Sequence, residues 1–161
     1  GLTQAKKAGA ICSFDMNLRE NLWPSMRHTL DRMWHVISLA DIVKLSFEEL
    51  EFLNQKSHQA MPLEHTIDTI LKAGVTCLLV TNGGEAINVY HADFKGQVSP
   101  PATNVVDTTS AGDAFNGVYL GARLSGSTIS DAISLAAKAA GIVIQHPGAI
   151  VPKGLVENAI S

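Results

Sequence analysis

The stretch that decides the fold covers residues 105–117 and reads Val105-Val106-Asp107-Thr108-Thr109-Ser110-Ala111-Gly112-Asp113-Ala114-Phe115-Asn116-Gly117. Two apolar residues lead into an acid, and hydroxyl-bearing and small residues follow before a second acid. Apolar side chains then recur at the spacing of one helix face, which predicts a helix. We expect Thr109 or Ser110 to cap this helix, because a side-chain oxygen there can accept hydrogen bonds from the first free backbone N–H groups.

The start of this helix is also suited to binding an anion. Ser110, Ala111 and Gly112 leave the backbone N–H groups accessible, and a helix N-terminus favours phosphate or a developing oxyanion. Asp113 lies in the first turn, so its carboxylate is expected beside the anion. A base in that position is suited to deprotonating a hydroxyl that attacks a phosphoryl group. The alternative is that these acids and hydroxyls only cap the helix.

Two acids six residues apart around Thr-Thr-Ser-Ala-Gly form a more specific string than a cap. The string resembles the Asp-Thr-x-Gly-Ala-Gly-Asp signature of the ribokinase-like (PfkB) family of carbohydrate kinases, with Ser110 where glycine is usual. The resemblance implies that Asp113 is the catalytic base. It also implies that the backbone N–H groups of Ala111, Gly112 and Asp113 stabilise the transferred phosphoryl group. ATP is then the expected donor, with Mg²⁺ bridging its phosphates.

A second string follows a predicted short buried strand at residues 9–14. It reads Phe14-Asp15-Met16-Asn17-Leu18-Arg19-Glu20-Asn21-Leu22-Trp23 and resembles the Phe-Asp-x-Asn-x-Arg-x-x-Leu-Trp segment of fructokinases and 2-keto-3-deoxygluconate kinases. Asp15, Asn17 and Arg19 offer a carboxylate, an amide and a guanidinium, a set suited to sugar hydroxyls and phosphate. The alternative is a solvated turn with a structural Asp–Arg pair. Trp23 is expected to pack on the protein.

Two loops are expected near the nucleotide. Ser46 and Glu49 have the spacing of a capping box at a helix start, and the place resembles the family's Asn-x-x-Glu motif, linked to magnesium and phosphate organisation, with Ser46 replacing Asn. The resemblance implies that Glu49 acts on magnesium indirectly. Thr81 and Gly83 stand in a Gly-containing turn that also fits a hairpin. The turn resembles the family's Thr-x-Gly-x-x-Gly loop, with Ala86 in place of the last glycine, and the resemblance implies that Thr81 and Gly83 contact the nucleotide.

The turn at residues 146–149 completes the expected site. In the family this turn borders the adenine, which implies that Gly148, with Ala149, contacts the nucleotide. Its carbonyl groups, together with Asp107 and Thr109, are implied to hold a monovalent cation such as K⁺. The nucleotide-binding set predicted in this way is Ser46, Glu49, Thr81, Gly83, Ser110, Gly112 and Gly148.

Composition restricts the class of protein. The chain has 161 residues, 46% of them hydrophobic, and a formal net charge of −3. This is typical of one globular domain, and the absence of a basic block argues against a nucleic-acid partner. No apolar run approaches the ~20 residues of a membrane span, which argues against a membrane partner. Cys12 and Cys77 lie in apolar runs, so we expect buried free thiols and a cytoplasmic location.

The order of elements predicts an α/β fold. Strands are expected at residues 41–45, 75–81 and 86–90 and helices at 24–39, 46–50 and 62–72; a polar connector (residues 97–102) then leads to two long helices. This order indicates a ribokinase-like, mainly parallel sheet with helices on both faces. Residues 1–9 look like the end of a helix closing on Gly9. Residues 1–161 are therefore expected to be the C-terminal portion of one ribokinase-like domain, whose N-terminal sheet half and lid lie outside the chain.

The leading functional hypothesis is an ATP-dependent carbohydrate kinase that converts fructose to fructose 6-phosphate. The expected partners are therefore the small molecules ATP and sugar, and a homodimer is a possible state of the full-length enzyme. Alternative substrates are 2-keto-3-deoxygluconate and a ribosyl nucleoside. A different class of function is a non-catalytic, nucleotide-binding regulatory module. Three departures from the family pattern favour that module, at Ser46, Ala86 and Ser110. Three retained residues favour catalysis: Asp107, Gly112 and Asp113.

Overall fold

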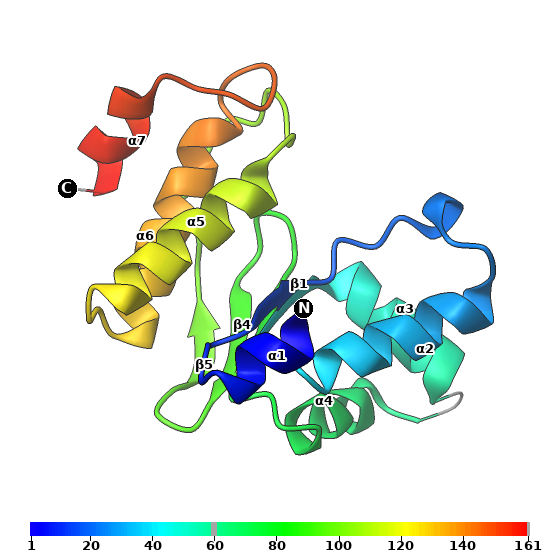
Figure 1. Ribbon diagram of the computed structural model, residues 1–161. Helices are drawn as coiled ribbons and strands as arrows, with labels where there is room; N and C mark the ends of the chain where they lie inside the picture. The colour runs from blue at the N-terminus through cyan, green and yellow to red at the C-terminus, as the bar shows by residue number, and fades with distance from the viewer. Residues whose placement is uncertain (59–60, 161) are drawn as a thin grey trace. The chain divides into compact units, whose positions relative to one another are not determined.

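The computed structural model describes residues 1–58 and 61–160. Its strands form one sheet in the order β1-β2-β3-β4-β5 (Figure 1). The first three strands pair in parallel, and β4 runs antiparallel to β3. The α/β class and the mainly parallel sheet predicted from the sequence are therefore confirmed.

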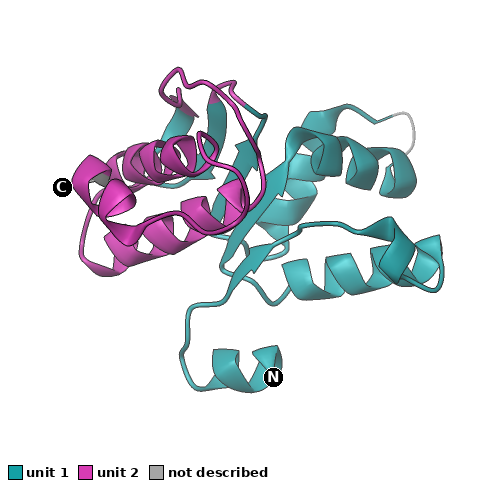
Figure 2. Ribbon diagram, turned by 90° about the horizontal axis from the view of Figure 1, so that it is seen from above, with its two compact units in different colours: residues 1–83, 87–96 teal, residues 84–86, 97–161 magenta. Residues whose placement is uncertain are grey.

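The chain divides into two compact units, coloured separately in Figure 2. The first unit comprises residues 1–83 and 87–96. Its elements are α1 (Leu2–Lys7), β1 (Ser13–Asp15), the 3₁₀ helix η1 (Glu20–Leu22), α2 (Met26–Ile37), β2 (Ile42–Ser46), α3 (Phe47–Ser57), α4 (Leu63–Lys72), β3 (Cys77–Thr81), β4 (Ile87–His91) and the first half of β5 (Lys95–Val98). The second unit comprises residues 84–86 and the described residues from 97 onward, with α5 (Ala111–Leu124), α6 (Ile129–Val143) and α7 (Lys153–Ile160).

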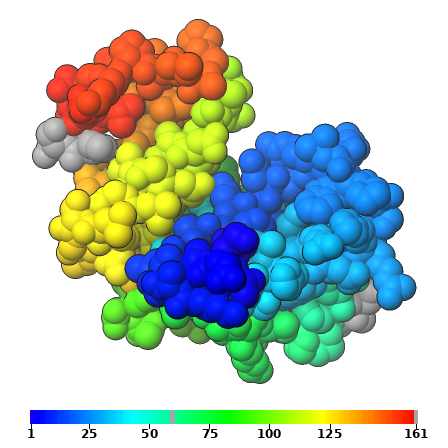
Figure 3. Space-filling view, viewed as in Figure 1, coloured from blue at the N-terminus to red at the C-terminus, as the bar shows by residue number. Residues whose placement is uncertain are grey.

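The core of the first unit lies between one face of the sheet and the helices α2, α3 and α4. Alternate residues of a strand point to the same face. Val43 and Leu45 of β2 and Leu78 and Val80 of β3 pack in this way into one apolar cluster with residues of all three helices. The helix α1 contributes no buried residue, and Figure 3 shows it in dark blue at the surface of this unit.

The start and end of the sheet differ from the sequence-based expectation. A buried strand was expected at residues 9–14, but β1 begins only at Ser13, and Ile11 is 69% exposed. The chain before β1 bonds to the loop ahead of β2 instead, because the Cys12 N–H donates to Asp41 Oδ2 at 2.8 Å. The polar connector expected from residue 97 begins as the end of β5, which is a neighbour of β4 in the sheet.

Three local expectations are confirmed: the capping box of α3, the glycine that follows α1 and the burial of both cysteines. Ser46 and Glu49 form the predicted capping box at the start of α3. The helices α1 and α4 are each followed by a glycine with positive φ, Gly9 at 79° and Gly74 at 108°, a conformation that glycine adopts without steric cost. Both cysteines are buried and free. Within the described residues, none of the helices is long and apolar enough to span a membrane.

The second unit is organised by the packing of α6 along α5, visible as two adjacent helices in Figure 1. Small residues allow a helix to approach its neighbours closely, and Ala132, Ala136 and Ala139 of α6 are fully buried. Thr128 caps α6, since its side chain accepts from the Asp131 N–H at 3.1 Å. The predicted pair of long helices is therefore confirmed.

The alanine packing of α6 can be tested with one substitution. Ala136→Leu places three extra carbon atoms where the exposed fraction is zero. We expect the free energy of unfolding to fall by about 1–3 kcal/mol, as for overpacked cores. Denaturant unfolding monitored by circular dichroism measures this. Lys138→Leu, at an exposed position of the same helix, is the matched control and should change stability by less than about 0.5 kcal/mol. Equal effects of the two variants would contradict the packing.

Candidate functional site

The carboxyl ends of β1, β2 and β3 carry one group of the predicted site residues. Asp15 pairs with Lys44 in the parallel register of β1 and β2, and Ser46 pairs with Thr81 in that of β2 and β3. Parallel pairing places the carboxyl ends of these strands at the same edge of the sheet, where α/β proteins bind ligands. Gly83, two residues beyond β3, has φ 52° and is exposed. The first unit therefore contains the predicted sugar residues and four of the predicted nucleotide residues, Ser46, Glu49, Thr81 and Gly83.

Residues 15–19 leave β1 in a conformation that is fixed by β2 and α3. The Asp15 carboxylate accepts a hydrogen bond from Lys44 Nζ at 2.9 Å, and the two charges form an ion pair. The Met16 N–H donates to the Lys44 carbonyl at 3.0 Å. The Leu18 N–H donates to Glu49 Oε1 at 2.6 Å. Lys44 was absent from the sequence-based site, although a lysine between Val43 and Leu45 in a buried strand was the signal that could have revealed it.

Glu49 joins this segment to the start of α3. One carboxylate oxygen accepts from Leu18, and the other accepts from the Ser46 N–H at 2.8 Å. In return the Glu49 N–H donates to Ser46 Oγ at 3.2 Å. The capping box predicted at Ser46 and Glu49 is thus also a contact with the segment expected to bind sugar.

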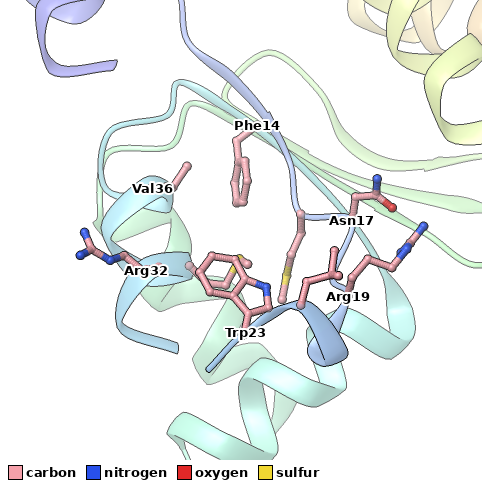
Figure 4. A pocket seen from close by; sticks show the side chains of 9 residues that line it. Phe14, Asn17, Arg19, Trp23, Arg32 and Val36 are labelled. Carbon is pink, nitrogen blue, oxygen red and sulfur yellow. The ribbon is translucent and has the colours of Figure 1, made fainter. Parts of the chain in front are cut away.

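Asn17 and Arg19 are the exposed polar side chains of residues 15–19. Figure 4 shows them beside each other at one side of a recess of about 360 Å³, with Arg32 at the other side. The walls of the recess are mostly apolar and comprise Phe14, Met16, Leu22, Trp23, Met33 and Val36. Trp23 is half-buried and packs against the core cluster, as predicted. Arg19 also borders a second recess of about 400 Å³, formed with Glu48, Glu49 and Phe52 of α3.

The second unit carries the other group of predicted residues, at the start of α5. Ser110 is the N-cap, but its φ is 60° and its side chain makes no capping hydrogen bond to the described residues. The prediction that a Thr109 or Ser110 side chain caps this helix is therefore wrong. The Thr109 hydroxyl instead donates to Asp107 Oδ1 at 2.7 Å, and Ser110 adopts a left-handed backbone conformation.

The free N–H groups at this helix start belong to Gly112 and Asp113. The Ala111 N–H donates to the Thr108 carbonyl at 3.2 Å, and the next amide that bonds outside the helix is that of Ala114, to the Ser110 carbonyl. Gly112 and Asp113 have no amide partner in the part of the chain that the structure describes, as expected for the first turn. The Asp113 side chain is exposed. A carboxylate and two free donors therefore share the first turn of α5.

Asp107 connects the segment before α5 with the turn after α6. Its Oδ1 accepts from the Thr109 N–H at 2.9 Å and from the Thr109 hydroxyl, and its Oδ2 accepts from the Gly148 N–H at 2.8 Å. The Val106 N–H donates to the Ile144 carbonyl at 2.7 Å. These bonds place Asp107, Thr109 and Gly148 together, as the sequence analysis expected.

The hydrogen bonds at Asp107 lower the pKa of its carboxyl group. The largest contribution is the Thr109 hydroxyl, followed by the backbone N–H groups of Thr109 and Gly148, and the small desolvation of the carboxylate acts in the opposite direction. The carboxylate of Asp107 is therefore held in its charged form beside the Thr109 hydroxyl.

The described residues provide few side chains that could bind a metal ion. Among residues 1–58 and 61–160, no group of three or more His, Cys, Asp or Glu side chains could hold a metal ion. Both oxygens of Glu49 already accept backbone hydrogen bonds. These side chains are therefore suited only to a Mg²⁺ ion whose ligands are mostly phosphate oxygens and water molecules.

Comparison with known proteins gives concordant results. Residues 2–154 match the family described as pfkB family carbohydrate kinase. Fructokinase-1 of Oryza sativa subsp. japonica is 40% identical over 116 residues, which are 72% of this chain and 35% of that protein. Fructokinase-1 of Zea mays is also 40% identical, with the same 72% and 35% coverage.

Solved structures are also similar to this chain. The structure of fructokinase with bound ATP from Xylella fastidiosa superposes with a TM-score of 0.88 and 30% identity, over 99% of this chain and 54% of that one. A fructokinase from Vibrio cholerae O395 in a fructose, ADP and calcium ion bound form gives 0.85 and 28%, over 99% and 54%. The chain thus spans about half of these solved proteins and about a third of the two plant fructokinases.

The left-handed backbone of Ser110 leads to a prediction for stability. A non-glycine residue in this conformation destabilises the fold by about 1–2 kcal/mol, a cost that glycine avoids. Glycine offsets part of this gain, because its more flexible unfolded chain lowers the free energy of unfolding by about 0.5–1 kcal/mol. We therefore expect Ser110→Gly to raise the free energy of unfolding by about 0.5–1 kcal/mol. Ser110→Ala separates the backbone from the hydroxyl and should be near neutral, because the hydroxyl makes no capping bond to the described chain. Destabilisation by both variants would show that the hydroxyl has an energetic role.

The depressed pKa of Asp107 leads to a prediction for pH dependence. Its hydrogen bonds stabilise the fold above the unfolded-state pKa of about 3.9 and are lost as the pH falls through the lower folded-state pKa. We expect the amide resonances of Thr109 and Gly148 to shift together, with a midpoint below about 3.9. NMR titration measures this, and Asp107→Asn should remove the step. A midpoint at or above the ordinary carboxyl value would contradict the hydrogen-bonding scheme.

Proposed function

The chain belongs to the pfkB family of carbohydrate kinases, and on that basis we propose that the full-length protein transfers the γ-phosphoryl group of ATP to a primary hydroxyl of a sugar. In this proposal the chain is the C-terminal, nucleotide-binding portion of a ribokinase-like domain. The observation that carries it is the start of α5, where the exposed Asp113 carboxylate shares one turn with the free N–H groups of Gly112 and Asp113.

Each group at this helix start has a role that follows from its chemistry. The Asp113 carboxylate accepts the proton of the attacking sugar hydroxyl, so that the oxygen bonds to phosphorus as the bond to ADP breaks. The N–H groups of Gly112 and Asp113, supported by the positive end of the α5 dipole, stabilise the charge on the transferred phosphoryl oxygens. The Ala111 N–H is held by Thr108, so Ala111 contributes by its small side chain.

The remaining predicted residues are assigned to binding. Asn17 and Arg19, with Asp15 behind them, recognise sugar hydroxyls or phosphate by charge-assisted hydrogen bonds. The nucleotide contacts are assigned to Ser46, Glu49, Thr81, Gly83, Ser110 and Gly148. Asp107 and Thr109, with carbonyl groups of the turn at 146–149, are assigned to a monovalent cation such as K⁺. Mg²⁺ bound to the nucleotide supplies charge neutralisation at the phosphates.

Fructose is the proposed acceptor. The support is the identity to plant fructokinases and the similarity to a bacterial fructokinase crystallised with fructose and ADP. A second solved relative, aminoimidazole riboside kinase from Salmonella enterica, is 25% identical with a TM-score of 0.83. Release of ADP should therefore be measured against fructose, 2-keto-3-deoxygluconate, ribose and ribosyl nucleosides. A sugar other than fructose as best substrate would overturn the substrate and leave the phosphoryl transfer in place.

The role of Asp113 is tested by Asp113→Asn in the full-length protein. We expect sugar-dependent ADP release to fall by about 10²–10⁴-fold, the usual effect of losing a general base. Binding of ATP, measured by calorimetry, should persist. Asp131→Asn is the matched control, because Asp131 is an exposed acid in the first turn of the neighbouring helix α6. Unchanged turnover in Asp113→Asn would refute the base assignment. Tight ATP binding by the wild type without ADP release for any sugar would indicate a regulatory module instead.

A further inference from the structure

Lys44 is a buried cation in a strand that is otherwise apolar at its centre. It lies between Val43 and Leu45, both fully buried, and is itself 8% exposed. Its ammonium group ion-pairs with Asp15, whose side chain is 23% exposed. Burying a charge is unfavourable, and replacing a buried ion pair with apolar residues is often neutral or stabilising. Fold stability alone therefore does not account for a lysine at this position.

The low exposure of Lys44 also argues against direct ligand binding. Its side chain is 11% exposed, and its ammonium group lies 2.9 Å from Asp15 Oδ1. A cation that is covered and neutralised in this way attracts a solvent-borne phosphate weakly. The partner of Lys44, however, is the first residue of the segment that carries Asn17 and Arg19.

Lys44 and Glu49 together hold residues 15–19 at three points. The Lys44 side chain holds the Asp15 carboxylate, the Lys44 carbonyl accepts from Met16 at 3.0 Å, and Glu49 accepts from Leu18 at 2.6 Å. Asn17 lies between these points with φ 40°, in the left-handed region that asparagine adopts more readily than most other non-glycine residues. The two exposed polar side chains, Asn17 and Arg19, extend from this fixed backbone and lie next to each other in Figure 4.

We propose that Lys44 is a positioning residue for the sugar: through Asp15 it fixes the backbone that presents Asn17 and Arg19 to the acceptor. This inference rests on the proposed function, because it assigns Lys44 a part in the same phosphoryl transfer. Fixing recognition groups before binding removes an ordering cost that would otherwise weaken the substrate complex. The energetic effect of the ion pair then appears in the affinity for the sugar.

The experiment compares steady-state kinetics of the full-length wild type, Lys44→Met, Lys44→Arg and Asp15→Asn with the best sugar of the panel. We expect Lys44→Met to raise the KM for the sugar about 10- to 100-fold, the scale of a small misplacement, and the KM for ATP less than twofold. Lys44→Arg keeps the positive charge, so its KM for the sugar should lie close to that of the wild type. Asp15→Asn should raise the KM for the sugar to a similar extent. A variant that combines Lys44→Met with Asp15→Asn should have a KM no higher than either single variant, because both substitutions remove the same contact.

Two controls separate positioning from folding. Lys72→Met removes an exposed lysine from the end of α4 and should leave the KM for the sugar unchanged. Thermal unfolding of each variant shows whether a change in KM follows a change in stability. Should Lys44→Met fail to fold, Asp15→Asn carries the same test. An unchanged KM for the sugar in a folded Lys44→Met or Asp15→Asn protein would overturn the proposal.

Amide hydrogen exchange at Met16 and Leu18 keeps this inference distinct from the proposed function. We expect Lys44→Met to increase exchange at these two amides at least tenfold, while amides in α6 keep their protection. If the wild type releases no ADP with any sugar, the kinase proposal fails, and faster exchange would still support the positioning of residues 15–19. Unchanged exchange in Lys44→Met would refute the positioning, whatever the kinetics of the wild type.

Discussion

Parallel pairing of β1, β2 and β3 is the constraint on which the first group of site residues depends. The register aligns Asp15 with Lys44 and Ser46 with Thr81, so residues 66 positions apart in the sequence reach one edge of the sheet. The apolar cluster between the sheet and helices α2, α3 and α4 fixes this register. A shift by one residue would turn the buried side chains of β2 and β3 away from these helices, namely Val43, Leu45, Leu78 and Val80. Core packing and site geometry are thus determined by the same alternation of side chains.

The second group depends on a helix start whose donors are left free. Where Ser, Thr, Asp or Asn is the N-cap residue, its side-chain oxygen commonly accepts a hydrogen bond from one of the first N–H groups. At α5 the hydroxyl of the N-cap residue Ser110 makes no such bond to the described residues, while the neighbouring Thr109 hydroxyl donates to Asp107. As a result, the first turn of α5 has free N–H donors next to the exposed Asp113 carboxylate. A capped helix such as α6, with Thr128 on Asp131, lacks this property.

The sequence allowed the fold class, the capping box of α3, the turn glycines and the two long helices to be predicted, because each follows from local spacing. It failed where a side-chain hydrogen bond replaces the contact that the local pattern suggests. The cap of α5 was misjudged because the Thr109 hydroxyl bonds to Asp107 within the same turn, and β1 was drawn too long because Asp41 holds the chain at Cys12. The roles of Asp113, Asn17 and Arg19 were reached by resemblance to a family. Lys44 was missed, because no spacing rule relates it to Asp15, 29 residues away.

The shared carboxylate of Glu49 has a consequence for motion. One side chain accepts from Ser46 at the cap of α3 and from Leu18 in the preceding loop. Fraying of the first turn of α3 therefore removes one of the three contacts that hold residues 15–19, and a displacement of that segment removes a contact from the carboxylate that caps the helix. We therefore expect the opening of this helix end and the opening of residues 15–19 to be coupled through one carboxylate.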